Sequence, residues 1–272
     1  MTANPLNDIR TLIATLPGPD EQARAEAAAA LVQPGAHGRL EETALWLAAW
    51  SGKARPALRR PILALYAGAP GPARLEVSEQ RRAQLEAIAA GQAQVSRMAQ
   101  SLGAGLEAFD LAIDRPIGDA AVGAALGERE AAATMAFGME VLAKQPDLLL
   151  LGEVGGEADS ARALFDALGA REGLEALRAL GTREIAAVAG AILGARIQKV
   201  PVILDGFGPA VAALAVRTLD PTAADHCRLA QPVEGIDIPA ILDLGIGASD
   251  GTAALAALSV VKLAGAVLSP AG

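Results

Sequence analysis

Short apolar runs alternate with longer helical patterns along most of this chain, and that alternation restricts the fold more than any other feature. Each run is followed by a tract in which apolar residues recur at helical spacing. The runs that read as buried strands are Pro61–Gly68, Leu106–Ile113, Asp147–Leu151 and Val200–Leu204. A further short strand is expected within Asp225–Val233. Repeated strand–helix–strand units are typical of a parallel sheet covered by helices, so we predict an α/β fold.

The stretch Ile241–Thr252, ILDLGIGASDGT, places an acid between a glycine-rich turn and an apolar helical pattern. Its spacing predicts a strand, a turn and then a helix start. Open α/β sheets bind ligands at the carboxyl ends of their strands, which makes Asp250 a candidate for chemistry. Capping of the following helix by Ser249 or Asp250 explains the same residues equally well. Both interpretations stay open on the sequence.

Two other predicted strands end in acids beside glycine: Glu153 in LLLLGEVGG and Asp205 in VILDGFG. The carboxyl ends of parallel strands share one edge of a sheet, so these acids are expected to lie near Asp243 and Asp250. Converging carboxylates can bind sugar hydroxyls, hold a cation, or raise the pKa of one member until it serves as a general base. Helix capping and pairing with arginine or lysine are the structural alternatives.

The glycine turn Gly152–Gly156 precedes a predicted helix and is a possible phosphate cradle, because the free N–H groups of a helix start attract anions. Glu157 and Asp159 follow at once, and their negative charge opposes phosphate binding there. The chain has no Walker pattern with its lysine and no dinucleotide fingerprint after an early strand. These absences argue against a nucleotide triphosphatase or an ordinary dehydrogenase.

Composition excludes several further classes of protein. A net charge of −8 without a basic stripe argues against binding to nucleic acid or to an anionic membrane. The single cysteine, Cys227, allows no internal disulfide and is interpreted as a structural thiol, and we expect neither a metal site nor a cofactor.

The longest apolar run, Ile185–Ala195, is about half of the ~20 residues that span a bilayer, and no secretory signal is evident. We therefore expect a cytoplasmic protein. Trp46 and Trp50 share one helical face and are assigned to core or interface packing.

Four stretches of the sequence resemble the nicotinate-nucleotide:dimethylbenzimidazole phosphoribosyltransferase family. They are GRLEETALWLA at Gly38–Ala48, DLLLLGEVG at Asp147–Gly155, EIAAVAGAILGARIQKVPVILDGF at Glu184–Phe207, and LDLGIGASDGTAALA at Leu242–Ala256. The resemblance implies a three-layer α/β/α domain with a parallel sheet, a small helical domain formed largely by the N-terminal region, and a homodimer. On this basis residues 1–58 form the small helical region and residues 59–272 the α/β domain.

The same resemblance implies a reaction. A nitrogen of the benzimidazole-type base attacks the anomeric carbon of nicotinate mononucleotide and releases nicotinate, as a step in making the lower ligand of cobalamin. The family's general base is a glutamate in a GEGT motif, and the matching residue here is Asp250 in SDGT. The partners implied are thus a small-molecule nucleotide and an aromatic base. The residues expected to bind substrate are Gly152, Glu153, Gly155, Asp205, Gly247 and Gly251.

The chain departs from the family pattern at the predicted phosphate turn and after the first strand. The family's GEMGIGNTT reads GEVGGEADS here, with Glu157, Ala158 and Asp159 at the changed positions. The family's AGDHGV reads AGAPGP, which places Ala69 and Pro70 where an acid and a histidine are expected. Asp250 keeps the carboxylate of the family's base but shortens its reach by one methylene, and proton transfer depends on hydrogen-bond distance.

The chain also lacks a long, lysine-bearing insertion between Leu168 and Glu184 and is about a fifth shorter than a typical member. Two hypotheses follow. The first is an active phosphoribosyltransferase with altered substrate handling and Asp250 as its base. The second is a paralogue that kept the scaffold, lost the transfer chemistry, and binds a base or nucleotide or acts as a partner subunit.

Overall fold

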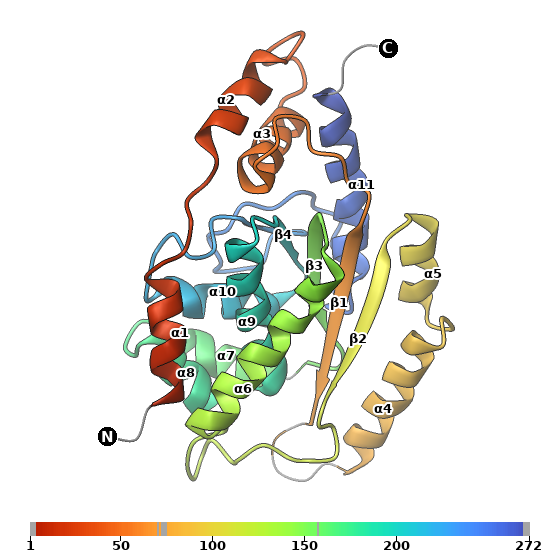
Figure 1. Ribbon diagram of the computed structural model, residues 1–272. Coiled ribbons are helices and arrows are strands. Elements are labelled where there is room, and N and C mark those ends of the chain that lie inside the picture. Colours follow the sequence, from red (N-terminus) through yellow and green to blue (C-terminus); the bar gives the residue numbers. More distant parts are fainter. Residues whose placement is uncertain (1–3, 70, 72–74, 157, 269–272) are drawn as a thin grey trace.

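A parallel sheet forms the centre of the molecule (Figure 1). The computed structural model describes residues 4–69, 71, 75–156 and 158–268, so Pro70 and Glu157 lie outside the described residues. Within these ranges the sheet has five strands in the order β2-β1-β3-β4-β5, and every pairing is parallel. The strands are β1 (Pro61–Gly68), β2 (Gly105–Leu111), β3 (Leu148–Glu153), β4 (Val202–Leu204) and β5 (Cys227–Leu229). The predicted α/β class is confirmed.

Both faces of the sheet are buried, which explains why its central strands are continuously apolar. All eight residues of β1 and all six of β3 are buried. Alternate residues of β1 enter two separate cores, with Tyr66 on one face and Leu65 on the other. Helices therefore have to cover each face, and the apolar runs leave polar groups only at the strand ends.

One face is covered by a group of helices in which α9 lies against the sheet. This group contains α1 (Pro5–Ile13), α6 (Glu128–Gly138), α7 (Ala158–Ala167), α8 (Gly173–Leu180), α9 (Arg183–Ile197) and α10 (Phe207–Arg217). A 3₁₀ turn, η1 (Met139–Lys144), continues α6. The apolar runs of the sequence are therefore the strands, and the longer helical patterns between them are the helices that cover the sheet.

The opposite face packs against α11 (Thr252–Val267), α5 (Gln94–Ser101) and the described part of α4 (Leu75–Ala89). Two N-terminal helices, α2 (Glu21–Ala29) and α3 (Arg39–Ser51), pack on each other, and α3 packs on α11 beyond the amino ends of the strands (Figure 1). The sequence places Asp20 before an alanine-rich helical pattern, which predicts a helix cap. The cap is confirmed, because the Asp20 Oδ1 atom accepts a hydrogen bond of 2.9 Å from the Ala23 amide.

Two predicted elements are wrong. The run at Ile241 forms no strand; the neighbouring Ala240 makes only an isolated parallel bridge with Leu229, and the next residues continue as an irregular loop. The partner strand β5 is three residues long and offers little edge for a sixth strand. The polar-to-amphipathic pattern of Ser78–Leu102 predicts one long helix, but the segment belongs to two helices, because α4 ends before Gly91, whose φ is +73°. None of the helices in the described part of the chain is long and apolar enough to cross a membrane.

Two glycines allow α6 and α9 to pack at very short separation. A Cβ atom on Gly190 of α9 would lie 1.8 Å from the Met135 carbonyl oxygen of α6. A Cβ atom on Gly138 of α6 would lie 1.9 Å from the Ala187 carbonyl oxygen of α9. Both distances are far inside van der Waals contact, so any larger residue would separate the two helices.

We predict that Gly190→Ala lowers the free energy of unfolding by about 1–3 kcal/mol, since overpacking in a dense core forces the backbone to move. Urea unfolding followed by circular dichroism measures the change. Gly123→Ala is the matched control, because a Cβ atom there would have no heavy atom within 4 Å. Equal stability of the two variants would contradict the close packing of α6 and α9.

Candidate active site

The ends of β3 and β4 meet the loop that precedes α11. The Glu153 amide donates a hydrogen bond of 3.0 Å to the Ser249 carbonyl oxygen. A Cβ atom on Gly152 would lie 3.0 Å from that same oxygen, and one on Gly206 would lie 2.3 Å from the Ser249 Cβ atom. Glycine at these two strand ends therefore lets the loop approach the sheet, and the three acidic turns lie together at the carboxyl edge.

Gln231 holds the same loop from the other side. Its side-chain Oε1 atom accepts a hydrogen bond of 3.0 Å from the Ile246 amide, and its Nε2 atom donates to the Ile246 carbonyl oxygen. These two hydrogen bonds join the chain just after β5 to the loop before α11. Gln231 is not among the residues predicted from the sequence; its signal is a polar residue close to the end of a buried strand, as for Glu153 and Asp205.

A cavity of about 320 Å³ lies beside these strand ends. Two of the predicted substrate-binding residues, Glu153 and Gly247, line it. The remaining wall comes from Gly156, the start of α7 and residues 206–208, 231–233 and 246–249. The cavity is therefore built from segments that lie far apart in the sequence but follow successive strands.

Two helices begin at the wall of this cavity. α7 begins at Ala158 and α10 at Phe207, and the N-cap residue of α10, Gly206, offers no side-chain cap. Free N–H groups at a helix start attract anions. The buried Glu153 carboxylate lies close to these starts, because a Cβ atom on Gly156 would lie 2.1 Å from its Oε1 atom and one on Gly208 would lie 2.5 Å away. A substrate anion would compete with this carboxylate.

A cation lies next to the cavity wall. The guanidinium carbon of Arg162 lies 4.7 Å from the centre of the Phe207 ring and 5.3 Å from the centre of the Phe165 ring. Arg162 is exposed, and Phe207 lines the cavity. The acid in the first turn of α7, Asp159, is also exposed and is not part of the cavity wall. At Asp159, the negative charge expected to oppose phosphate binding is therefore not part of the cavity wall.

Asp205 is fully buried and supports the start of α11. Its Oδ2 atom accepts a hydrogen bond of 3.1 Å from the Ala254 amide. Burial raises the pKa of Asp205 to about 7, backbone amides oppose that shift, and the nearby charge of Asp250 adds to it. Asp205 therefore changes protonation close to neutral pH, at the base of the loop that carries Asp250.

Asp250 is half-buried and accepts a hydrogen bond of 3.1 Å at Oδ1 from the Thr252 amide. The capping interpretation of Asp250 therefore applies to one of its oxygens. The N-cap residue itself is Gly251, whose φ is +94°, and a Cβ atom there would lie 2.5 Å from a Leu63 methyl carbon. Asp243 is exposed in the same loop. In the described part of the chain, no three His, Cys, Asp or Glu side chains are grouped to hold a metal ion.

A buried ion pair lies at the same edge and was missed by the sequence analysis. The Arg81 Nη1 atom lies 3.1 Å from the Glu184 Oε1 atom and donates to the Gly68 carbonyl oxygen at 2.7 Å. Burial raises the pKa of Glu184, and the Arg81 charge opposes the shift. Gly155, with φ at +67°, lies against Arg81, since a Cβ atom there would lie 2.8 Å from Arg81 Nε. An acid at the start of an otherwise apolar helix was the available signal.

The cavity, which one acid lines, lies at the carboxyl edge of a parallel sheet, where α/β proteins bind small molecules, and the comparisons with known proteins give the class of this one. The family model described as phosphoribosyltransferase matches residues 16–172 and 159–271. The chain is 39% identical over 320 aligned positions to the nicotinate-nucleotide–dimethylbenzimidazole phosphoribosyltransferase of Allorhizobium ampelinum, covering 98% of this chain and 94% of that protein. The protein of the same name from Rhizobium etli is 40% identical, covering 96% and 93%.

The fold is also similar to a crystal structure. The nicotinate-nucleotide–dimethylbenzimidazole phosphoribosyltransferase of Thermus thermophilus superposes with a TM-score of 0.82 at 23% identity, covering 92% of this chain and 96% of that one. The chain therefore belongs to the nicotinate-nucleotide–dimethylbenzimidazole phosphoribosyltransferase family. The alignment with the Allorhizobium protein spans 320 positions, more than the 272 residues present here, so that relative contains insertions that this chain lacks.

We predict that Asp205→Asn flattens the dependence of stability on pH. The pKa of Asp205 is raised on folding, so the folded state holds more protons and stability falls as pH rises from about 4 through about 7. Asparagine does not titrate, so the wild type should lose about 3 kcal/mol more than the variant between pH 5 and pH 8, because nearly two pH units below the folded pKa contribute ~1.4 kcal/mol each. Urea unfolding at both pH values measures this. The exposed Asp243→Asn control should keep the wild-type slope, and an unchanged slope in Asp205→Asn would refute the assignment.

Proposed function

We propose that this protein transfers phosphoribose from nicotinate mononucleotide to a benzimidazole-type base in the synthesis of the cobalamin lower ligand. This proposal rests on the near full-length similarity of the chain to relatives named nicotinate-nucleotide–dimethylbenzimidazole phosphoribosyltransferase. The nitrogen of the base attacks the anomeric carbon, the bond from that carbon to nicotinate breaks, and nicotinate leaves. The proton lost from the base passes to a carboxylate of the protein.

Asp250 is the proposed general base. It stands at the carboxyl edge of the sheet, and the Thr252 amide fixes one of its oxygens. General bases act at hydrogen-bond distance, so a fixed carboxylate favours catalysis over a mobile one. Asp205 is proposed as a positioning residue, because it binds the Ala254 amide and so holds the helix start beside Asp250.

The cavity of about 320 Å³ is proposed to hold the ribose phosphate. The starts of α7 and α10 supply N–H groups toward a phosphate, and Arg162 supplies a positive charge next to Phe207. Glu153 is proposed to contact ribose hydroxyls rather than phosphate, because a carboxylate accepts hydrogen bonds from hydroxyl groups. Gly152, Gly155, Gly247 and Gly251 are proposed to allow close approach of backbone to substrate.

The arrangement of the whole protein is part of the proposal. Residues 59–272 would form a three-layer α/β/α domain, and residues 1–58 a small helical domain beside it. Two such chains would form a homodimer in the cytoplasm. The family membership and the packing of α2 and α3 on each other support these assignments.

We predict that the purified protein releases nicotinate from nicotinate mononucleotide only when dimethylbenzimidazole is present. Asp250→Asn should lower kcat by about 100-fold or more, because its amide can still accept the Thr252 hydrogen bond but cannot take a proton. Asp250→Glu keeps a carboxylate and should retain activity. Liquid chromatography of the reaction mixture measures both products.

Asp8→Asn, on the exposed surface of α1, is the control and should leave the rate unchanged. If Asp250→Asn turns over at the wild-type rate, Asp250 is not the base. If the wild type binds neither substrate and releases no nicotinate, the scaffold-only paralogue replaces the transferase.

A further inference from the structure

A second and larger pocket lies at the opposite end of the sheet from the candidate active site. Its volume is about 560 Å³, within the range of small-molecule sites. It is formed by α2 and α3 on one side and by Cys227, the first residue of β5, with its neighbours on the other. The active-site cavity and this pocket share no lining residue.

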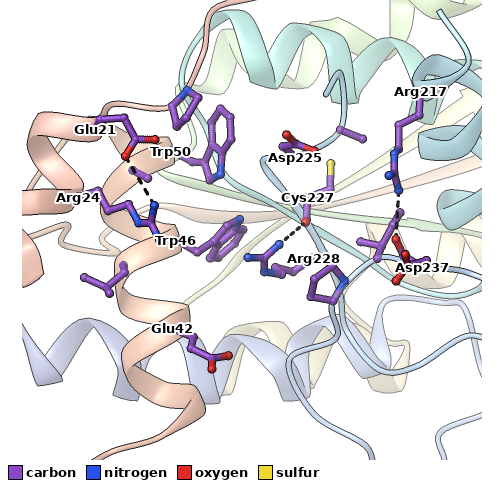
Figure 2. Close-up of a pocket in the computed structure, with 16 residues that line it drawn as sticks. Glu21, Arg24, Glu42, Trp46, Trp50, Arg217, Asp225, Cys227, Arg228 and Asp237 are labelled. Carbon is purple, nitrogen blue, oxygen red and sulfur yellow. Dashed lines mark hydrogen bonds and ion pairs between the residues drawn. The ribbon is translucent and has the colours of Figure 1, made fainter. Parts of the chain in front are cut away.

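Two aromatic rings form the α3 side of the pocket, as Figure 2 shows. Trp46 and Trp50 are both buried, and they are the two tryptophans of the chain. The indole N–H of Trp46 is buried without an acceptor among the described residues. A buried donor without a partner is costly, and a ligand acceptor would relieve that cost.

Two half-buried arginines also line the pocket: Arg228 lies over Trp46, and Arg217 donates hydrogen bonds to the Pro221 and Asp237 carbonyl oxygens. The guanidinium carbon of Arg228 lies 5.5 Å from the centre of the Trp46 ring, and neither Arg228 nor Arg217 makes an ion pair with a described carboxylate. Arg228 has one long hydrogen bond, of 3.5 Å, to the Cys227 carbonyl oxygen. Burial lowers the pKa of Arg228, because keeping the guanidinium charged away from water costs free energy. A bound anion would reduce that free-energy cost.

The acids of the pocket lie on its rim. Glu21, Glu42, Asp225 and Asp237 are all exposed, and Glu21 pairs with Arg24 at 3.6 Å. Exposed charges are hydrated and screened by salt, so each of these acids opposes a bound anion less strongly than a buried carboxylate would. Burial raises the pKa of the Cys227 thiol, which stays neutral and adds no negative charge.

The geometry points to a binding site for a small aromatic carboxylate, separate from the site of phosphoribosyl transfer. The carboxylate would accept hydrogen bonds from Arg228 and from the Trp46 indole, while the ring packs among Trp46 and Trp50. Arginine is well suited to this task because its planar guanidinium binds a carboxylate through two parallel hydrogen bonds.

Tryptophan fluorescence reports on this pocket alone, because both tryptophans line it. Titration of the full chain with nicotinate should change the emission and saturate. Nicotinamide has the same ring without the charge and should bind about tenfold or more weakly, since a charge-assisted hydrogen bond is lost. Arg228→Gln should weaken nicotinate binding by a similar factor, and Arg228→Lys by less.

Arg24→Gln is the matched control, since Arg24 lies on the exposed rim, and it should bind nicotinate as the wild type does. Circular dichroism establishes that each variant is folded. If Arg228→Gln does not fold, the comparison of nicotinate with nicotinamide on the wild type decides. No saturable change with nicotinate, equal binding of nicotinamide, or unchanged binding by folded Arg228→Gln would each overturn the proposal.

Discussion

Burial of both faces of the sheet is the constraint on which the rest of this structure depends. Along β1 and β3 no residue reaches solvent, so a polar side chain on these strands has to lie at an end. At the carboxyl end the starts of α10 and α11 provide N–H groups that no carbonyl of their own helix accepts. Glu153 and Asp205 occupy the positions where a strand stops and a helix start is within reach. The fold thus concentrates carboxylates and N–H donors at a single edge.

The same N–H groups can stabilise the fold or bind a ligand. At Asp205 the carboxylate supports α11 directly, and its pKa near 7 shows that burial outweighs the amide donors there. At Glu153 the carboxylate lies beside the starts of α7 and α10. If the cavity holds a ribose phosphate as proposed, the phosphate and this carboxylate would share these helix starts, so affinity would depend on the local packing around Gly156 and Gly208.

The sequence predicted the elements whose pattern is local and missed the contacts that join distant segments. The strand over Pro61–Gly68 and the Asp20 cap follow from burial and capping rules, and both are confirmed. The Arg81–Glu184 pair joins residues 103 positions apart, so no local pattern reveals it. The strand predicted at Ile241 is wrong, although its apolar run resembles those of the true strands. Whether it could pair with the sheet depended on the length of β5, which is only three residues.

The missing strand changes how Asp250 is held. A residue at the end of a strand is fixed by ladder hydrogen bonds, but Asp250 ends a loop fixed by Gln231, by the Ser249 carbonyl oxygen and by the Thr252 amide. Gln231 makes two hydrogen bonds to Ile246 and the other two contacts are one hydrogen bond each, so the loop is held at a few points rather than along a ladder. Aspartate is one methylene shorter than the glutamate expected at this position. A loop does not have to follow the line of a strand, so the place where these contacts hold Asp250, rather than its mobility, has to make up that reach.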